Sequence, residues 1–437
     1  MAVKGMQPGR PAHRLMRMNK ELRAAAGLVL ALAVAGCGTT TQAAPIVARG
    51  VAVREPLADP RPYGAADTAF GLDTLGAWCR ADPQANLVLS PSSLASGLGM
   101  AYLGARGGTA RAMAGVLHLP VAGGQALEAG LQARSAALRR LDGPGVTVDT
   151  SDQVWADPTL TTLRGYLDAV ATGYDAGVAH VPLLRNPDQA AREISQAIAA
   201  ATHGQIRQLL APGSLQDIGW VLTDSLYLKA AWATPFQASQ TSRGPFTTAS
   251  GRTVSADYMN GGPYAAASAD GWTAVQLPYH GGQLALLALL PPSGIDGCAL
   301  PTAAQLGTLS ATLAAGGPDA GTDIREIALP KVTIRDQVSM RGVLTELGMG
   351  VAFTPAADFA GLSPQACCIG LVEHAATLQV GERGTVASAA TAVGLEPTAA
   401  RAGPPPVRFD RPYLMVVTDA TTGEPLIMAW VADPAAR

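Results

Sequence analysis

The sequence is poor in aromatic and charged residues. Of its 437 residues, 5% are aromatic and 15% are charged, whereas 48% are hydrophobic. A chain of this length can bury a large core, as one large domain or two ordinary ones, and the scarcity of aromatic residues means that small side chains build it. The formal net charge is -2, and because residues 1–36 are basic, the remainder is mildly acidic. This charge argues against nucleic acid as a partner.

Motifs of common secreted hydrolases are also missing. The sequence has no Gly-x-Ser-x-Gly, no serine followed three residues later by lysine, and no His-Glu-x-x-His. These patterns carry the nucleophile or the metal of such enzymes, and the cysteine spacing does not suit zinc. These absences argue against a secreted enzyme such as a serine hydrolase or a penicillin-binding type, and we predict no cofactor and no metal.

The N-terminus has the pattern of an export signal. Basic residues precede a short apolar run at 24–36, which is too short to span a bilayer comfortably as a stable helix. The run ends Val-Ala-Gly-Cys, which resembles the cleavage box of bacterial lipoproteins. It predicts a signal peptide at 1–36 and a lipid on Cys37, with an ordinary signal peptide as the alternative. Residues 37–62 have no periodic pattern and predict a flexible tether, so the chain is expected outside the cytoplasm, anchored to the membrane by lipid or secreted.

Four further cysteines are Cys79, Cys298, Cys367 and Cys368. Export permits disulfides, but the sequence does not give their connectivity. The adjacent pair Cys367 and Cys368 is not expected to form a bond between its own members. Buried free thiols remain the other possibility.

Helical spacing dominates the first half of the chain and strand patterns the second, which predicts the α+β class. A serine at 90 and an Asn or Asp at 186–188 are predicted to cap helices. Helices are expected near 64–80, 94–103, 160–176, 189–201 and 338–348. Strands are expected near 86–89, 147–156, 220–228, 272–279, 283–290, 327–334, 375–380, 413–418 and 426–431.

The stretch after the strand at 375–380 is the most informative of the sequence. From Thr385 to Val393 every residue is small or β-branched and none is charged. Such a segment can be an exposed loop, yet it also suits a central strand, which must be uncharged on both faces. Gly384 gives it a flexible start. Strand alternation would place Thr385, Ala387, Ala389, Thr391 and Val393 on one face and Val386, Ser388, Ala390 and Ala392 on the other.

Taken in order, the motifs resemble the serpin family over residues 63–437. They lie at 86–93, 103–109, 202–206, 224–236, 277–279, 329–331, 347–349, 351–363, 382–385 and 409–413. The resemblance implies a large central mixed β-sheet with additional sheets, about eight to nine helices and an exposed reactive-centre loop at about 382–408. It implies hinge residues at Glu382, Gly384, Thr385, Ala387, Ser388, Ala389 and Ala390.

The activity that this resemblance implies is inhibition of a serine-type endopeptidase by a monomer that is not itself an enzyme. The protease cuts the loop as a substrate and forms an acyl-enzyme. The hinge strand then inserts into the central sheet and traps the protease. A non-inhibitory serpin-fold lipoprotein, acting as a binding or structural protein, is the alternative.

Two counts place the reactive bond differently. Counting forward from Gly384 at the family's usual length gives Thr398–Ala399, whereas counting back from residues 409–412 gives Arg401–Ala402, so the loop is about three residues longer than usual. Arg401 suits trypsin-like proteases, and Thr398 suits elastase-like or subtilisin-like ones. We favour Arg401 because residues 404–408 resemble the segment that follows the cut.

The resemblance also implies a polar region where the central strands part. Asp224 departs from the family, which usually has Asn there, and a buried carboxylate must be paired or protonated. We expect Asp224, Asn86 and His374 in or near one hydrogen-bond cluster, although simple satisfied core polar groups are an alternative. The full set that the resemblance places in this region is Asn86, Ser90, Ser93, Asp224, Trp232 and His374.

Overall fold

The computed structural model describes residues 45–436 except 55, 57, 296 and 386–404, and the side chains at 151, 152 and 224 are not described. The α-helices are α1 (Arg61–Ala81), α2 (Pro91–Gly104), α3 (Gly107–Val116), α4 (Gly124–Arg139), α5 (Arg164–Tyr174), α6 (Pro187–Ala201), α7 (Ala303–Ala315) and α8 (Arg341–Leu344). The strands are β1 (Ile46–Ala48), β2 (Leu87–Leu89), β3 (Val146–Ala156), β4 (Val178–His180), β5 (Trp220–Ala231), β6 (Ser242–Thr247), β7 (Thr253–Ala269), β8 (Trp272–Pro278), β9 (Leu284–Leu290), β10 (Thr322–Pro330), β11 (Val332–Ser339), β12 (Glu373–Gly381), β13 (Gly384–Thr385), β14 (Val407–Arg408), β15 (Tyr413–Asp419) and β16 (Pro425–Val431).

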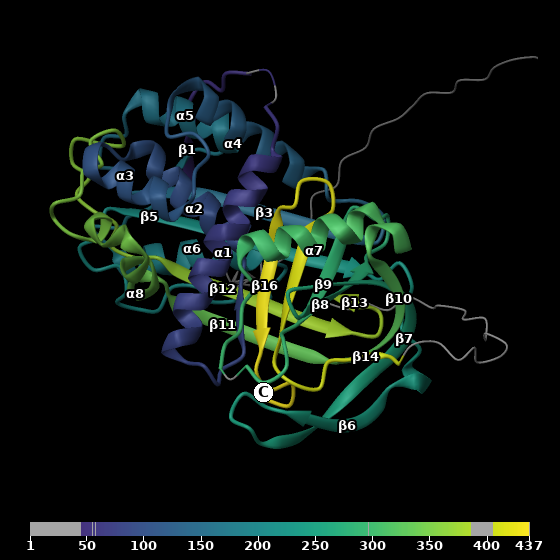
Figure 1. Cartoon of the computed structure of the whole chain (residues 1–437). Coiled ribbons are helices and arrows are strands. Elements are labelled where there is room, and N and C mark those ends of the chain that lie inside the picture. Colours follow the sequence, from purple (N-terminus) through teal and green to yellow (C-terminus); the bar gives the residue numbers. More distant parts are fainter. Residues whose placement is uncertain (1–44, 55, 57, 296, 386–404, 437) are drawn as a thin grey trace, which may run out of the picture. The chain divides into compact units, whose positions relative to one another are not determined.

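The first sheet has seven strands in the order β1-β4-β3-β5-β13-β12-β11 (Figure 1). Because the two-residue strand β13 is antiparallel to both of its neighbours, β5 and β12 run parallel to each other. Among the strands that the structure describes, β13 alone joins β5 to β12. Within the described residues, the sheet is thus complete at one end of this strand pair, and no strand bridges β5 and β12 along the rest of it.

The second sheet has nine strands, eight in the order β14-β10-β7-β8-β9-β15-β16-β2 and β6 paired with β7. Every residue of β9 and β16 is buried, as expected for strands that are covered on both faces. Side chains of this sheet pack against the inward residues of β12, including Ala376, Leu378 and Val380. The largest hydrophobic core therefore lies between the two sheets.

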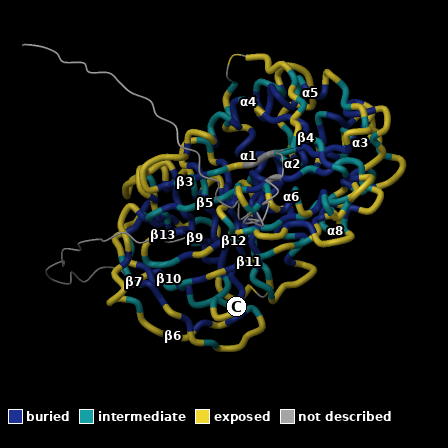
Figure 2. Tube along the Cα trace, turned by 180° about the vertical axis from the view of Figure 1, so that it is seen from behind, coloured by how far each residue is buried: buried dark blue, intermediate teal, exposed yellow. Residues whose placement is uncertain are grey.

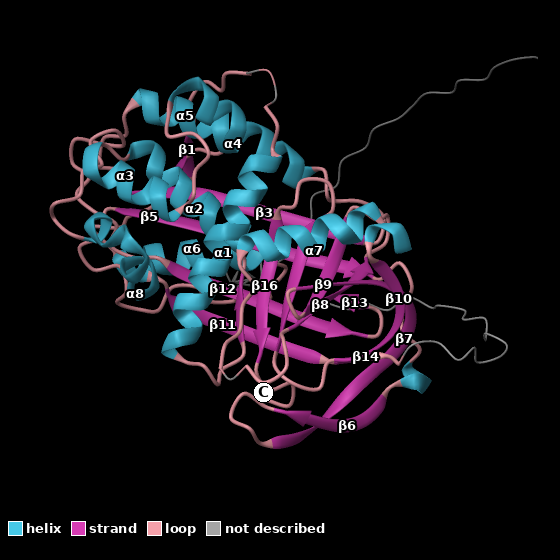
Figure 3. Cartoon of the chain, viewed as in Figure 1, coloured by secondary structure: helices cyan, strands magenta, loops and turns pink. Residues whose placement is uncertain are grey.

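Helices cover the remaining faces and gather at one end of the molecule (Figure 3). Helices α2, α3 and α5 pack against the segment that connects β11 to β12 in one core cluster. Helix α6 packs against Trp155 and Val221 in another. Figure 2 shows buried residues along the inner strands and α2, with exposed residues on β6, on part of β7 and on the surrounding loops. The seven-stranded sheet is consequently packed on both faces.

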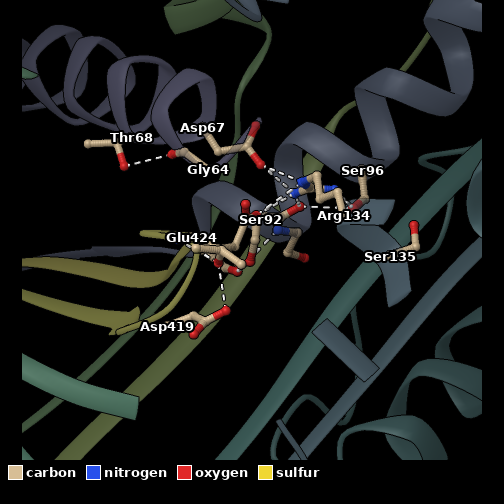
Figure 4. A network of polar contacts seen from close by, with 12 residues as sticks. Gly64, Asp67, Thr68, Ser92, Ser96, Arg134, Ser135, Asp419 and Glu424 are labelled. Carbon is tan, nitrogen blue, oxygen red and sulfur yellow. Dashed lines mark hydrogen bonds and ion pairs between the residues drawn. The ribbon is translucent and has the colours of Figure 1, made fainter. Parts of the chain in front are cut away.

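A buried ion network joins four elements of this core (Figure 4). Arg134 of α4 lies 2.6 Å from Asp67 of α1 and 2.8 Å from Glu424, which precedes β16. The same guanidinium donates to the Ser96 hydroxyl and to the Ser92 carbonyl of α2. Burial raises the pKa of Asp67, Arg134 opposes that rise, and Glu424 adds to it. The network fixes α2 at the end that faces β12.

Most predicted elements are present, and both predicted helix caps are confirmed. Ser90 accepts a hydrogen bond from the Ser93 backbone at the start of α2, and Asn186 accepts one from Gln189 at the start of α6. These hydroxyl and amide oxygens satisfy backbone N–H groups that lack a partner within the helix.

Two predicted elements need correction. The single strand predicted at 327–334 is two strands in different sheets, β10 and β11, with Lys331 between them. Pro330 has no N–H for a continued ladder, and the chain changes sheets directly after it. The helix predicted at 338–348 is shorter, because β11 continues to Ser339 and α8 passes into a π-helical turn, Thr345–Met349.

The predicted flexible tether is held against the body over part of its length. Residues 46–48 form β1, which pairs antiparallel with β4 at the edge of the first sheet. Farther along, the Val51 and Val53 backbones donate to Asp168 and Thr172 of α5 at 2.6 and 3.0 Å. The prediction of a tether without structure therefore does not hold for this segment.

A disulfide joins Cys79 of α1 to Cys298, which precedes α7, with a Cα–Cα distance of 6.1 Å. Cys367 and Cys368 are free and exposed. Within the part of the chain that the structure describes, no helix is both long and apolar enough to cross a membrane.

Candidate functional site

The segment that the sequence marks as a hinge begins as a strand inside the first sheet. After β12 the chain turns at Glu382 and Arg383 and returns as β13. Thr385 pairs with Val380 of β12 on one side and with Ala230 of β5 on the other. The first two residues after the turn thus already occupy a central position between β5 and β12.

Gly384 is required by this arrangement. Its φ is +142°, a value that residues with a side chain rarely adopt, and an added Cβ would overlap the carbonyl oxygen of Ala230. Glycine is the residue that fits such a close backbone approach. The sequence indicated flexibility at this position, and the structure shows close packing against β5.

Thr385 is fixed from within the core. Its side chain is buried, and its hydroxyl lies 2.5 Å from the hydroxyl of Tyr279. The Tyr279 ring stacks on Trp232 with centroids 4.5 Å apart, and the Trp232 indole donates to the Gly381 carbonyl at 2.8 Å. Trp232, which was predicted to lie in the region where the central strands part, therefore supports the β12–β13 turn from within the core.

Glu382 anchors the same turn from the other side. One carboxylate oxygen accepts hydrogen bonds from Thr241 at 2.9 Å and from Lys331 at 3.0 Å. Partial burial would raise the pKa of Glu382, but its own backbone N–H, Lys331 and Thr241 together hold that pKa below its usual value. The Glu382 carbonyl also accepts from the Phe236 backbone at 2.8 Å. The turn is thus bound to three other segments of the chain.

The far end of the predicted loop lies on the second sheet. β14 pairs in parallel with β10, and the Pro405 carbonyl accepts from Arg325 at 2.8 Å. Phe409 directly after β14 is fully buried. Residues 386–404 therefore connect two fixed ends on different sheets.

At the opposite end of the β5–β12 pair, His374 of β12 lies against the start of α2. Its Nε2 accepts a hydrogen bond from the Ser90 backbone at 3.2 Å. His374 is buried, and burial lowers its pKa to about 4, so the imidazole is neutral and free to accept. The Ser90 hydroxyl in turn accepts from the Ser93 backbone at 3.3 Å, and Ser93 and His374 line the same cavity.

Asn86 does not share this cluster. Its side-chain oxygen accepts from the Ala432 and Asp433 backbones at 2.8 and 2.9 Å, and its amide donates to the Asp433 carbonyl at 2.7 Å. The expectation of one cluster with His374 is therefore wrong for Asn86, because the amide caps the strand end after β16. Asp224 lies in β5 opposite Asp152 of β3, and its side chain is outside the described part of the structure.

A cavity of about 30 Å³ lies between α2, β5 and the start of β12. Its walls include Leu98 of α2, Leu222 of β5 and His374. The space marks the place where the two parallel strands are not bridged.

Several functional contacts were not predicted, namely those of Tyr279, Thr241 and Lys331. Each lies more than 50 residues from its partner in the chain, so no local spacing could reveal them. Several predicted site residues lie outside the described residues: Cys37, Ala387, Ser388, Ala389, Ala390, Thr398, Ala399, Arg401 and Ala402.

The fold and this site agree with the comparison to known proteins. Residues 65–434 match the family model described as "Serpin (serine protease inhibitor)". An uncharacterized serpin-like protein of Thermococcus kodakarensis is 31% identical over 80% of this chain and 81% of its own length. Leukocyte elastase inhibitor of Bos taurus is 29% identical, over 75% of this chain and 88% of its own. The chain belongs to the serpin family.

Solved structures support the same fold. The native thermophilic serpin tengpin has a TM-score of 0.73 at 20% identity, covering 88% of this chain and 97% of tengpin. Native protease nexin-1 with heparin has a TM-score of 0.71 at 22% identity, covering 86% of this chain and all of its own. The predicted α+β serpin fold, with a large central mixed sheet, a further sheet and eight α-helices among the described residues, is confirmed. Serpins are generally protease inhibitors and not enzymes.

Proposed function

We propose that this serpin inhibits serine endopeptidases by trapping them as the reactive loop inserts between β5 and β12. The observation that carries the proposal is the position of Gly384 and Thr385, which pair with both strands where no other described strand joins them. An inserting strand needs a starting register and an open place to extend. β13 supplies the starting register, and the stretch of β5 and β12 that no described strand bridges supplies the place to extend.

The register of β13 gives the expected partners of an inserted strand. Continued without a shift, it places Ala387 between Leu228 and Leu378, and Thr391 between Asp224 and His374. Leu228 and Leu378 are buried, so small side chains are needed on this face. Val386 falls between Lys229 and Gln379 on the outer face. Residues 385–393 are all uncharged and either small or β-branched, so they suit both the buried face and the outer face of the sheet.

The chemistry itself belongs to the protease. Its nucleophile attacks the loop carbonyl and releases the new amino terminus, which leaves an acyl-enzyme on the cleaved loop. Insertion then draws the acyl-enzyme along the sheet. Deacylation needs a water positioned to within about 1 Å, so distortion of the protease stops it. The serpin contributes the reactive bond, the hinge residues and the sheet into which the loop inserts.

The loop sequence suggests which bond the protease cleaves. We favour the Arg401–Ala402 bond as the reactive bond and a trypsin-like protease as the target. The acidic pocket of such enzymes pairs with the guanidinium. Thr398–Ala399 is the alternative and would suit elastase-like or subtilisin-like enzymes.

The proposed location is outside the cytoplasm, with a lipid on Cys37 anchoring the chain to a membrane. The Cys79–Cys298 disulfide supports this location, because such bonds persist in oxidising compartments. Labelling with a radioactive fatty acid in a bacterial host tests the anchor. Incorporation that is lost in Cys37→Ser supports it, and equal labelling of both proteins contradicts it.

Incubation with trypsin, elastase and subtilisin tests the inhibitory function. We expect a complex with trypsin that survives denaturing electrophoresis, and Arg401→Ala should abolish it. Cleavage of the loop by all three enzymes without any stable complex would favour a non-inhibitory binding protein. Thyroxine-binding globulin, solved in complex with thyroxine, shares the fold (TM-score 0.69, 21% identity, covering 85% of this chain and 99% of its own).

A further inference from the structure

Cys367 and Cys368 lie together on the surface. Their sulfur atoms are 2.8 Å apart, and both residues are exposed and free. The same chain holds Cys79 and Cys298 in a disulfide, so a compartment that forms that bond also exposes this pair to oxidants. The pair is therefore a surface dithiol that neither the trapping mechanism nor the core uses.

The chain on either side of the pair is fixed. The Ala366 backbone donates to the Ser363 carbonyl at 3.2 Å, and the Ile369 backbone donates to the Ala352 carbonyl at 2.9 Å. Ser363 and Ile369 are both buried. The two cysteines thus form a short link between anchored points, which keeps their sulfur atoms close together.

A disulfide between adjacent cysteines would be labile. Consecutive Cα atoms are about 3.8 Å apart, whereas ordinary disulfides span about 4.4–6.8 Å. A bond closed at the shorter distance is strained, and strained or exposed disulfides are reduced easily. Such a bond would be poor as a structural crosslink and suitable as a reversible one.

The surroundings of Cys368 favour a stepwise reaction. Partial burial and the neighbouring Cys367 raise the pKa of the Cys368 thiol to about 11, while Arg341 opposes this rise. Cys368 is therefore protonated at neutral pH. A protonated Cys368 suits the second, resolving step, and the first attack on an external disulfide is left to its neighbour Cys367.

We propose that Cys367 and Cys368 form a thiol–disulfide exchange site for small disulfides of the glutathione class. Cys367 sulfur attacks one sulfur of the external disulfide, which forms a mixed disulfide and releases one external thiol. Cys368 sulfur then attacks Cys367 sulfur, closes the intramolecular disulfide and releases the second external thiol. The protein loses two electrons and two protons, and the external disulfide gains them.

The position of the pair connects this chemistry to the sheet. Ile369, Leu371 and Val372, directly after the cysteines, line the cavity between α2, β5 and β12. Closing the ring stiffens the link that enters β12, and β12 must move away from β5 when a strand inserts. Oxidation should therefore slow insertion; this second step rests on the proposed inhibitory function.

The exchange itself can be tested without any protease. The folded protein is equilibrated in reduced and oxidised glutathione, its free thiols are alkylated, and the peptide that contains both cysteines is weighed. In oxidised buffer we expect a peptide without alkyl groups that is 2 Da lighter than the unmodified dithiol peptide, and this loss should be reversible. The reduced chain should bind one phenylarsine oxide. Both signals should be lost in Cys368→Ser. Cys79 is fully buried, so its disulfide serves as the unchanged internal reference.

Alkylation of both thiols in every buffer would overturn the proposal. Stable glutathione adducts or crosslinked dimers without the 2 Da loss would also overturn it. For the second step, the stoichiometry of trypsin inhibition should rise at least twofold on oxidation in the native chain and stay constant in the double variant Cys367→Ser/Cys368→Ser. A 2 Da loss with unchanged stoichiometry would refute the coupling alone, and absence of inhibition in either redox state would refute the proposed function while leaving the exchange site intact.

Discussion

The Thr385 hydroxyl lies 2.5 Å from the Tyr279 hydroxyl, and both side chains are buried. This contact joins the first residues of the reactive loop to the second sheet. Because Tyr279 also stacks on Trp232, the loop start is fastened to the aromatic side chains that support the β12–β13 turn.

The Thr385–Tyr279 contact should stabilise the docked loop start. A double-mutant cycle with Thr385→Val and Tyr279→Phe is expected to give a coupling free energy of about 1 kcal/mol, the usual net value of a buried hydrogen bond. Urea unfolding of the four uncleaved proteins measures it. Additive single effects would show that the two hydroxyls do not interact.

Gly384→Ala should expel the loop start from the sheet. The new Cβ would overlap the Ala230 carbonyl, so we expect a loss of about 1–3 kcal/mol in stability and slower complex formation with trypsin. Gly381→Ala is the matched control, because an added Cβ there meets nothing within 4 Å. It should change stability by no more than about 0.5 kcal/mol. Equal effects of the two substitutions would contradict the close packing described for Gly384.

The sequence was sufficient to predict the serpin fold and the loop start, because these depend on short motifs and on local composition. The uncharged run from Thr385 onward predicts a strand wherever it lies. Ser90 likewise predicts the start of α2, because the capping residue and the helix are adjacent in the chain.

Contacts between distant residues were less predictable. Asn86 bonds to Asp433, which lies 347 residues away, and nothing near Asn86 distinguishes this partner from His374. The docking of residues 46–53 was missed for a related reason. Its backbone hydrogen bonds depend on β4 and α5, whereas its own sequence has no strand pattern.

The position of the reactive bond should control how tightly the protease is held. Cleavage at Arg401 leaves three more extended residues than cleavage at Thr398, which is roughly 10 Å of slack. The double variant Thr398→Arg/Arg401→Ala moves the same bait to the shorter position. Titration of trypsin should give a stoichiometry closer to one for this variant than for the native chain, and mass spectrometry identifies the bond. A stoichiometry that does not change would show that loop length has no influence.

Acid should weaken the native state through His374. Its pKa is about 4 in the folded chain because of burial and about 6.5 when unfolded. Above pH 6.5 the imidazole is neutral in both states. As the pH falls from 6.5 to 4, only the unfolded chain gains the proton, so stability falls by about 3 kcal/mol.

Denaturant midpoints of the native chain and of His374→Gln between pH 7 and 4 measure this term. Other titrating groups, including Asp67, contribute equally to both proteins. The difference between the two curves should therefore shrink or change sign as the pH falls. Parallel curves would show that His374 does not titrate differently on unfolding.

The most direct test of loop insertion is the melting temperature before and after cleavage of the loop. Insertion of residues 386–393 would add a ladder to both β5 and β12, on the order of 10 kcal/mol, and should raise the melting temperature by at least about 10 °C. Val386→Glu faces outward in the predicted register and should keep the rise, whereas Ala387→Glu would place a carboxylate between Leu228 and Leu378 and should abolish it. A cleaved native chain that melts at the same temperature as the intact one would contradict insertion.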